Sequence, residues 1–171
     1  MKVMTGKGKR NKGNSFERRV SKMIVAAFKE LGITAEDCYR TPLSGGHRYS
    51  KKEDPGDLVI SPKLQKLFPF TVECKNDRRA NISHFFNLKS TTPEVRWWKQ
   101  ACQQNKSEAT SPLLVFKAHH EIFCCVLEGF IPEDRGTSAL LSVEYDCMPT
   151  AVLKFATLLR FIVSVAKLTT K

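Results

Sequence analysis

The chain has 171 residues, of which 42% are hydrophobic and 26% are charged. This composition is typical of one globular domain with a core of normal size, and it excludes a wholly disordered chain, a collagen and a small disulfide-rich fold. The 28 Lys and Arg residues against 17 Asp and Glu give a net charge of +11, and residues 1–52 alone carry +9 (13 basic, 4 acidic). Such a basic sector favours nucleic acid as a partner over the plainer alternative that the charge serves solubility.

The first segment, residues 1–13, is rich in Lys, Gly and Asn and almost free of apolar residues. We expect it to form a flexible basic arm. Neither a signal-peptide-like apolar stretch nor an uninterrupted run of 18 apolar residues occurs. We therefore expect no membrane segment and a cytoplasmic location, in the host cytoplasm if the chain is viral. The six cysteines form no CxxC pair, and we expect reduced thiols.

A helix is predicted over residues 14–31, because apolar residues recur there at intervals of three and four. Asn14 is the expected N-cap and Gly32 the expected stop. Glu17 lies on or beside the buried face of this helix, where a carboxylate needs a reason. A capping box with Asn14 is the structural explanation, and a place in an active site is the functional one.

Three strands follow in the middle of the chain. A short strand at 38–40 leads into a loop at 41–56, and a strand at 57–61 leads through a connector at 64–68 to a strand at 70–75. In this last strand apolar and polar residues alternate, so Glu73 and Lys75 should share one face.

The second half should contain a helix at 93–104, strands at 113–117 and 122–127 joined as a hairpin, a loop at 128–149 and a helix at 151–168 capped by Thr150. The last helix is apolar around most of its surface, so it must pack on its own core or on a partner. The expected class is α/β, with a mixed central sheet flanked by helices. We divide the chain into an arm at 1–13, a core at 14–127 and a C-terminal extension at 128–171.

A candidate catalytic site is indicated by polar residues at the ends of the middle strands. Asp57 starts one strand, and Glu73 and Lys75 follow on the next with the pattern GD-x₁₅-ExK. Carboxylates at adjacent strand ends suit Mg²⁺ or Mn²⁺, and a lysine beside them can neutralise charge on a phosphate or an attacking water. These are the parts of metal-assisted phosphodiester hydrolysis. The plainer alternative is a surface Glu–Lys pair and a turn aspartate, but both parts lie inside apolar strand patterns.

A family resemblance accompanies this pattern. The segments GNSFERRV, RTPLSGG, DPGDLVI, FTVECKN, WWKQA and PLLVFK, within residues 13–117, resemble the PD-(D/E)XK nuclease superfamily. Within it they are most similar to archaeal-type Holliday junction resolvases and their phage relatives. The resemblance implies a restriction-endonuclease-like core. It also implies that Asp57 and Glu73 bind the metal together with the carbonyl of Cys74, that Lys75 positions or polarises the attacking water, and that Glu17 holds a second metal or a water on it.

Two further residues enter through the resemblance. Ser44, in the Ser-Gly-Gly loop, would contact the scissile phosphate or a nearby water, or else be a plain turn residue. Gln100 is similar to a helix glutamine found near the site in several branches of the superfamily. The chain departs from the family pattern in having Gly56, not proline, before Asp57, and in a tail from about residue 128 with no evident counterpart.

The expected partner is branched double-stranded DNA, above all a four-way junction, cut by a Mg²⁺-dependent endodeoxyribonuclease. Paired cuts across a junction are most simply made by a C2 homodimer. The alternatives are a nuclease of the same superfamily acting on other DNA structures, and a non-catalytic nucleic-acid-binding protein. Beside the catalytic residues Glu17, Ser44, Asp57, Glu73 and Lys75, the residues expected to contact DNA are Lys7, Lys9, Arg10, Lys12, Arg40, Arg78, Arg79 and Gln100.

Overall fold

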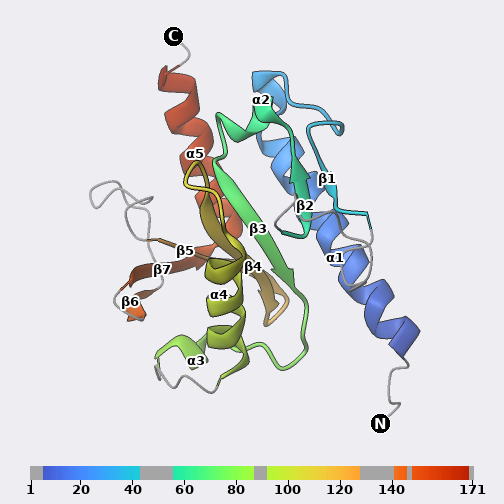
Figure 1. The fold of residues 1–171 in the computed structure, drawn as a ribbon, viewed down its shortest axis with the longest axis vertical. Coiled ribbons are helices and arrows are strands. Elements are labelled where there is room, and N and C mark those ends of the chain that lie inside the picture. Colours follow the sequence, from blue (N-terminus) through green and yellow to red (C-terminus); the bar gives the residue numbers. More distant parts are fainter. Residues whose placement is uncertain (1–5, 43–55, 87–91, 128–140, 146–147, 170–171) are drawn as a thin grey trace.

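A computed structural model describes residues 6–42, 56–86, 92–127, 141–145 and 148–169. Its elements, in chain order, are α1 (Gly6–Ala27), the 3₁₀ turn η1 (Lys29–Leu31), β1 (Cys38–Arg40), β2 (Leu58–Ile60), α2 (Pro62–Gln65), β3 (Phe70–Lys75), α3 (Ser83–Phe86), α4 (Pro93–Gln104), β4 (Ser111–Ala118), β5 (Glu121–Leu127), β6 (Leu141–Tyr145), β7 (Met148–Lys154) and α5 (Phe155–Thr169) (Figure 1). The predicted α/β class with a mixed sheet and flanking helices is confirmed.

The described residues form a five-stranded sheet in the order β3-β4-β5-β7-β6. Strands β3 and β4 are parallel and are joined through α4, as parallel neighbours require a crossover. The other pairs in this sheet are antiparallel, and β1 and β2 form a separate antiparallel pair. Because β3 is the first strand in this order, one of its edges is not covered by another strand of the sheet.

The β4–β5 connection is the predicted hairpin. Ala118 pairs with Glu121, so only His119 and His120 form the turn, and both have positive φ angles of 48° and 68°. Two consecutive left-handed residues are the mark of a tight turn whose twist matches that of the strands. The two adjacent histidines therefore form the turn itself.

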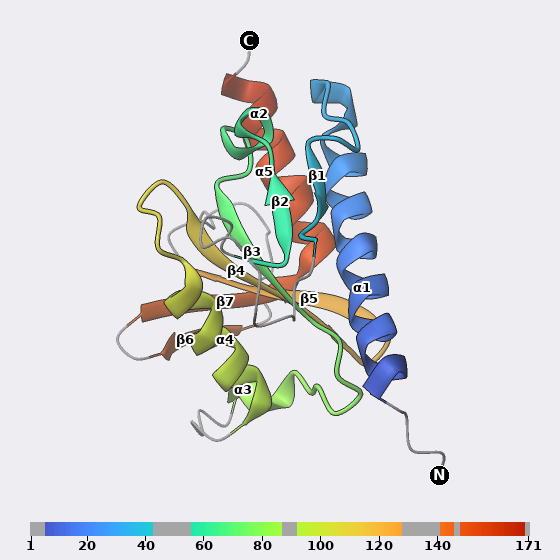
Figure 2. The same cartoon turned by 45° about the vertical axis from the view of Figure 1, so that its right-hand side comes forward.

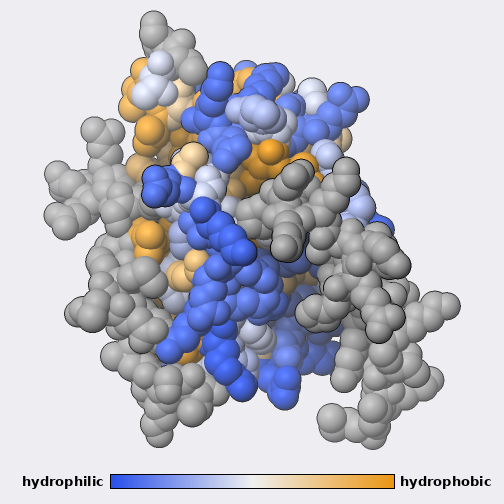
Figure 3. All heavy atoms as spheres, viewed as in Figure 1, coloured by the Kyte–Doolittle hydropathy of each residue, from blue (hydrophilic) through white to orange (hydrophobic). Residues whose placement is uncertain are grey.

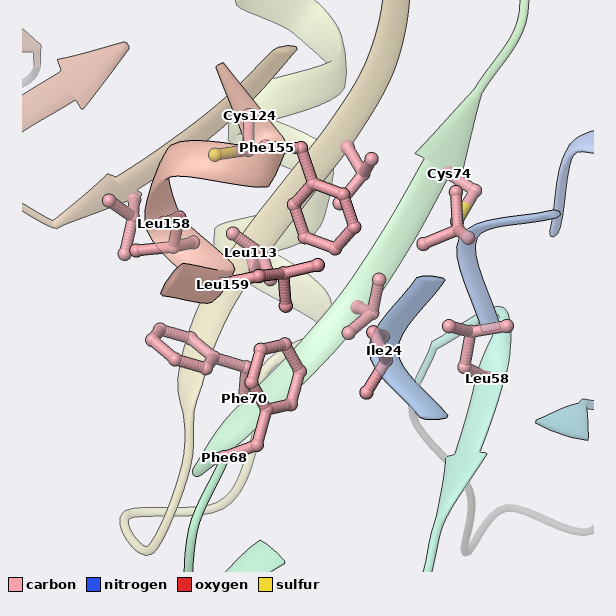
Figure 4. Close-up of a cluster of buried hydrophobic side chains, with 14 of the residues drawn as sticks. Ile24, Leu58, Phe68, Phe70, Cys74, Leu113, Cys124, Phe155, Leu158 and Leu159 are labelled. Carbon is pink, nitrogen blue, oxygen red and sulfur yellow. The ribbon is translucent and has the colours of Figure 1, made fainter. Parts of the chain in front are cut away.

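Helices cover both faces of the sheet, and alternate residues of each strand enter different cores. On β5, Cys124 belongs to the cluster under α1 and α5, whereas Cys125 belongs to the cluster under α3 and α4. Figure 2 shows α1 and α5 on the other side of the sheet from α4. In the first core, Ile24 of α1, Phe70 of β3 and Leu159 of α5 converge between the two helices and the sheet (Figure 4).

The first helix departs from the prediction at both ends. It begins at Gly6 rather than residue 14, so residues 6–13 of the expected flexible arm are helical and Asn14 is not an N-cap. Packing of Phe16, Val20 and Ile24, all at most 4% exposed, fixes the helix, and each residue added to an existing helix costs little. The helix ends at Ala27, and the turn η1 leads to Gly32, whose φ of 75° closes this part as predicted.

The C-terminal part also differs. Residues 141–145 and 148–149, predicted as loop, belong to β6 and β7, and the last helix begins at Phe155, not at 151. Thr150 is a buried residue of β7 rather than a helix cap. The run from Ala151 onward is apolar throughout, and a buried strand followed by a buried helix has the same hydrophobic pattern as one helix.

Two sequence expectations concern bulk properties. The five cysteines in the described segments are free thiols, as predicted. Of the helices in those segments, none combines the length and the apolar character needed to cross a membrane.

Candidate active site

Strand β3 carries the two central polar residues of the site on the face that meets α4. Leu114 and Phe116, their partners on β4, belong to the core under α4. Glu73 is only 5% exposed, and its Oε1 accepts a hydrogen bond from Gln100 Nε2 of α4 at 3.2 Å. The same oxygen pairs with the ammonium group of Lys75. Glu73 and Lys75 therefore share one face, as predicted, and Gln100 of α4 holds the buried Glu73 while Lys75 is half-buried.

Asp57 is attached to the open edge of β3. Its N–H donates to the Val72 carbonyl at 2.8 Å, and its Oδ2 accepts from the Cys74 N–H at 2.8 Å. These backbone groups are the ones that an edge strand leaves unpaired. The carboxylate thus lies alongside the strand that carries Glu73 and Lys75.

Gly56 explains why the chain departs from the family's usual proline at this point. Its φ is 113°, which proline cannot adopt and which other L-residues rarely adopt. A Cβ placed on Gly56 would lie 2.8 Å from the Val72 carbonyl oxygen. Only glycine can therefore approach β3 closely enough for the next residue, Asp57, to make its two hydrogen bonds.

Glu17 enters the site from α1 and is paired with Arg40 of β1. Arg40 Nε donates to Glu17 Oε2 at 2.5 Å, and both side chains are largely buried. The charge of Glu17 also acts on Asp57, so the helix residue belongs to the same electrostatic cluster. Because Asn14 lies inside α1, the predicted capping box does not explain Glu17, and its pairing with Arg40 is the structural reason for a carboxylate beside the buried face of the helix.

The electrostatics show that negative charge is concentrated here. Burial, the nearby carboxylate of Glu73 and then that of Glu17 together raise the pKa of Asp57 to about 7, while the Cys74 N–H and Lys75 act in the opposite direction. Burial and the carboxylates of Asp57, Glu17 and Glu73 raise the pKa of the Cys74 thiol. A cation placed among these groups would be strongly stabilised.

The donor set fits a hard divalent cation. Asp57 and Glu73 offer carboxylate oxygens, and Mg²⁺ in proteins is held by one or two carboxylates, with waters and substrate phosphates as its other ligands. Within the described ranges, no three His, Cys, Asp or Glu side chains are gathered into a ready metal site. Glu17 therefore does not join Asp57 and Glu73 as a preformed third ligand.

The other residues expected to contact DNA are dispersed. Arg78 is exposed, and Arg79 forms an exposed ion pair with Asp77 at 2.8 Å. Lys12 is half-buried near the site strand, since its carbonyl accepts from Asn76 at 3.5 Å. The backbone of Lys7, Lys9 and Arg10 lies in α1, and Ser44 lies outside the described residues. Gln100 and Arg40 are brought to the candidate catalytic residues Glu73 and Glu17.

Two roles were missed from the sequence. Arg40 was expected to contact DNA, but its pairing with Glu17, 23 residues away, depends on tertiary packing. Glu94 of α4 is fully buried, and its oxygens accept from the Asn81 N–H and face His84 Nδ1, both at 2.8 Å. Neither has a local sequence signal, although a buried carboxylate must be hydrogen-bonded wherever it occurs.

Comparison with known proteins agrees with this geometry. The family model described as phage putative PDDEXK endonuclease matches residues 8–145 of the 171. No curated protein and no solved structure matches significantly. The match extends past residue 128, through β6, so part of the tail that lacked an evident counterpart belongs to the family pattern. The chain belongs to the phage putative PDDEXK endonuclease family and is a member of the PD-(D/E)XK nuclease superfamily.

Proposed function

We propose that the protein is a metal-dependent, structure-selective DNA endonuclease, and that its substrate is a Holliday junction. The observation that carries the nuclease proposal is the meeting of Asp57, Glu73 and Lys75 at the open edge of β3 in a chain of this family. The resolvase-like segments around Glu17 and Ser44, together with the basic N-terminal sector, support branched DNA as the substrate. A nuclease of a phage family would act in the host cytoplasm.

In this proposal the side chains divide the work. Asp57 and Glu73, with the Cys74 carbonyl, would hold Mg²⁺ or Mn²⁺, and Glu17, oriented by Arg40, would help to hold a second ion. When bound, the ion supplies charge stabilisation at the phosphate and lowers the pKa of water. Lys75, held by Glu73, steadies negative charge as the water attacks. Ser44 would contact the phosphate or a nearby water.

Symmetry enters through the substrate. A four-way junction is resolved by two cuts on opposing strands, and a C2 homodimer places two equal sites in that relation. Sedimentation at micromolar concentration, with and without junction DNA, tests this part: we expect a dimer in at least one condition. A strict monomer in both would rule the dimer out.

The decisive experiment compares DNA shapes. A labelled four-way junction and a linear duplex of the same sequence are incubated with the protein in Mg²⁺. We expect paired cuts in the junction and little cutting of the duplex. Equal cutting of both would support a nuclease of this superfamily acting on other DNA structures. Asp57→Ala and Glu73→Ala separate the remaining alternative, since a non-catalytic binding protein would be unaffected by either change.

A further inference from the structure

Helix α4 has one side in the core and one side facing outward. Val95, Trp98 and Ala101 are at most 2% exposed and pack under the sheet. On the outward side, Arg96 and Gln103 are exposed, and Lys99 and Gln100 are half-buried. We refer to these four residues, Arg96, Lys99, Gln100 and Gln103, as the α4 polar face.

This face adjoins the catalytic residues. Gln100 donates to Glu73 Oε1 at 3.2 Å, so the middle of the face touches the candidate metal ligand. Arg96 precedes Gln100 by four residues and Gln103 follows it by three, and such intervals place side chains on one side of a helix. A molecule bound at Glu73 that extends along α4 therefore meets Arg96 in one direction and Gln103 in the other.

The charge of the face is positive. The charged residues of α4 are Glu94, Arg96 and Lys99. Glu94 is fully buried, and its oxygens are engaged by Asn81 and His84, so it offers no carboxylate to the outer surface. Figure 3, in the same orientation as Figure 1, shows hydrophilic side chains running down the middle of the molecule over α4.

Resting on the proposed nuclease function, we propose that the α4 polar face binds the sugar–phosphate backbone next to the phosphate that is cut. Four helical residues span about 6 Å along the axis, and phosphates of one DNA strand are spaced about 3.4 Å along the duplex axis. Arg96 can therefore reach a phosphate one or two positions from the one beside Glu73. Arginine and glutamine both bind phosphate oxygens, and such contacts position DNA without reading its sequence.

The test uses a matched pair of exposed helix arginines, Arg96 on α4 and Arg160 on α5. Arg160 is the control, because α5 contacts β5, β7 and α1 and lies on the other side of the sheet from α4. The variants Arg96→Glu, Arg96→Gln and Arg96→Lys, with Arg160→Glu and Arg160→Gln, are made in the full chain. Binding of a fluorescent four-way junction and of a matched duplex is measured by anisotropy in EDTA over a range of salt, and cutting is measured in Mg²⁺.

We expect Arg96→Glu to weaken binding of both DNA shapes at least tenfold more than Arg160→Glu does. Arg96→Gln should make the slope of log affinity against log salt shallower by about 0.9, the value for one phosphate that the protein no longer neutralises. Arg96→Lys should restore most of the affinity that Arg96→Gln loses, because a lysine still neutralises one phosphate charge.

Equal effects of the Arg96 and Arg160 variants, with a wild type that binds and cuts junctions, would overturn the inference and leave the nuclease proposal intact. A wild type that binds DNA but never cuts it would refute the nuclease proposal, and the Arg96 comparison would still decide whether α4 binds DNA. A wild type that binds no DNA would overturn both.

Discussion

Asp57 and Glu73 reach the site in different ways, and both are fixed before any ligand arrives. Asp57 is held by two hydrogen bonds with the edge of β3, and Glu73 by Gln100 and Lys75. The carboxylates of Asp57 and Glu73 repel each other, as the raised pKa of Asp57 indicates. A cation bound between them would relieve this repulsion. The edge of β3 and the side chains of Gln100 and Lys75 together thus organise the site.

Neutralising either carboxylate should abolish most of the activity. We expect Asp57→Asn and Glu73→Gln each to lower the single-turnover cutting rate at least about 10²–10³-fold, since each removes a preorganised charged group. DNA affinity in EDTA should stay within a few-fold of wild type, which shows that the variants are folded. Cutting at the wild-type rate by either variant would remove that residue from the mechanism.

Asp57 should also make the stability of the metal-free protein depend on pH. Its pKa of about 7 lies above that of the unfolded chain, near 4, so the folded state binds the proton more tightly between these values. The free energy of unfolding should therefore fall as pH rises from about 4 to about 7, by on the order of 2–4 kcal/mol.

The asparagine of the Asp57→Asn variant cannot ionise. This variant should therefore lose most of the fall in unfolding free energy between about pH 4 and pH 7, and it should be more stable than wild type above pH 7. Urea unfolding in EDTA at several pH values measures the free energy of unfolding of both proteins. Adding Mg²⁺ at pH 8 should raise the free energy of unfolding of the wild-type protein but not that of the variant. Parallel pH profiles for the two proteins would contradict the assignment.

The sequence predicted how the polar side chains of β3 are arranged, but it did not predict the tertiary contacts around the site. Glu73 and Lys75 are two residues apart on a strand, and that spacing alone places them on one face. The Arg40–Glu17 pair joins a strand to a helix and arises only from folding. The role of Gly56 could be recognised as a departure from the family pattern, but its positive φ and its close approach to Val72 required the structure.

Among the connecting segments, the turn at Gly56 sets the position of the site. We expect Gly56→Ala to destabilise the fold by about 1–3 kcal/mol, because it adds a methyl group 2.8 Å from a carbonyl oxygen at a positive φ. It should also reduce cutting strongly, since Asp57 is displaced.

Gly32→Ala is the matched control. Gly32 also has a positive φ, of 75°, but a Cβ added there would lie 3.5 Å from its nearest neighbour, the flexible end of the Lys63 side chain. It should cost about 1 kcal/mol and leave activity unchanged. Thermal unfolding together with a cutting assay separates the two variants. Equal activity in both would mean that Asp57 does not depend on this turn.

The sequence of helix α5 was compatible with packing on its own core or on a partner, and the structure places it on its own core. Phe155, Leu158 and Leu159 are at most 4% exposed and belong to the core shared with α1 and the sheet (Figure 4). We expect Leu159→Arg to unfold the protein, because a buried charge is left without a partner. Val165→Arg, on the same helix at 42% exposure, should be tolerated within about 0.5 kcal/mol. Circular dichroism on heating measures both, and a folded Leu159→Arg would contradict this packing.

Element boundaries were harder to predict than the elements themselves. The helical period from Phe16 to Phe28 and the alternation of β3 are strong local patterns, and both elements are found. The start of α1 at Gly6 lies in a segment without apolar residues to mark it. The change from β7 to α5 lies within one continuous apolar run, which periodicity cannot divide.

For the whole molecule, the order of the strands explains where the site lies. Within the described residues, β3 is the first strand of its sheet, with α4 on one face and α1 near the other, so its edge can hold the Asp57 carboxylate, which a central strand could not (Figure 1). The basic N-terminal sector belongs to this side through α1, whose residue Lys12 contacts Asn76 just beyond β3.

The basic N-terminal sector should add affinity without selecting a DNA shape. Deleting residues 2–12 removes five positive charges. We expect weaker binding to junction and duplex alike, and a salt slope shallower by about 0.9 for each phosphate that the shortened protein no longer neutralises. Replacing the same Lys and Arg residues by Gln keeps the length of α1 and is the control. An unchanged slope in both would mean that this sector does not bind DNA.

The central claim is that the groups at the edge of β3 hydrolyse DNA with the help of a divalent cation. The most direct measurement is single-turnover cutting of a four-way junction by the same protein sample in EDTA and after Mg²⁺ is restored, beside Glu73→Gln. The account predicts no cutting in EDTA, full recovery with Mg²⁺, and at least about a 10²-fold lower rate for the variant in Mg²⁺. Full activity in EDTA, or a variant as active as wild type, would contradict it.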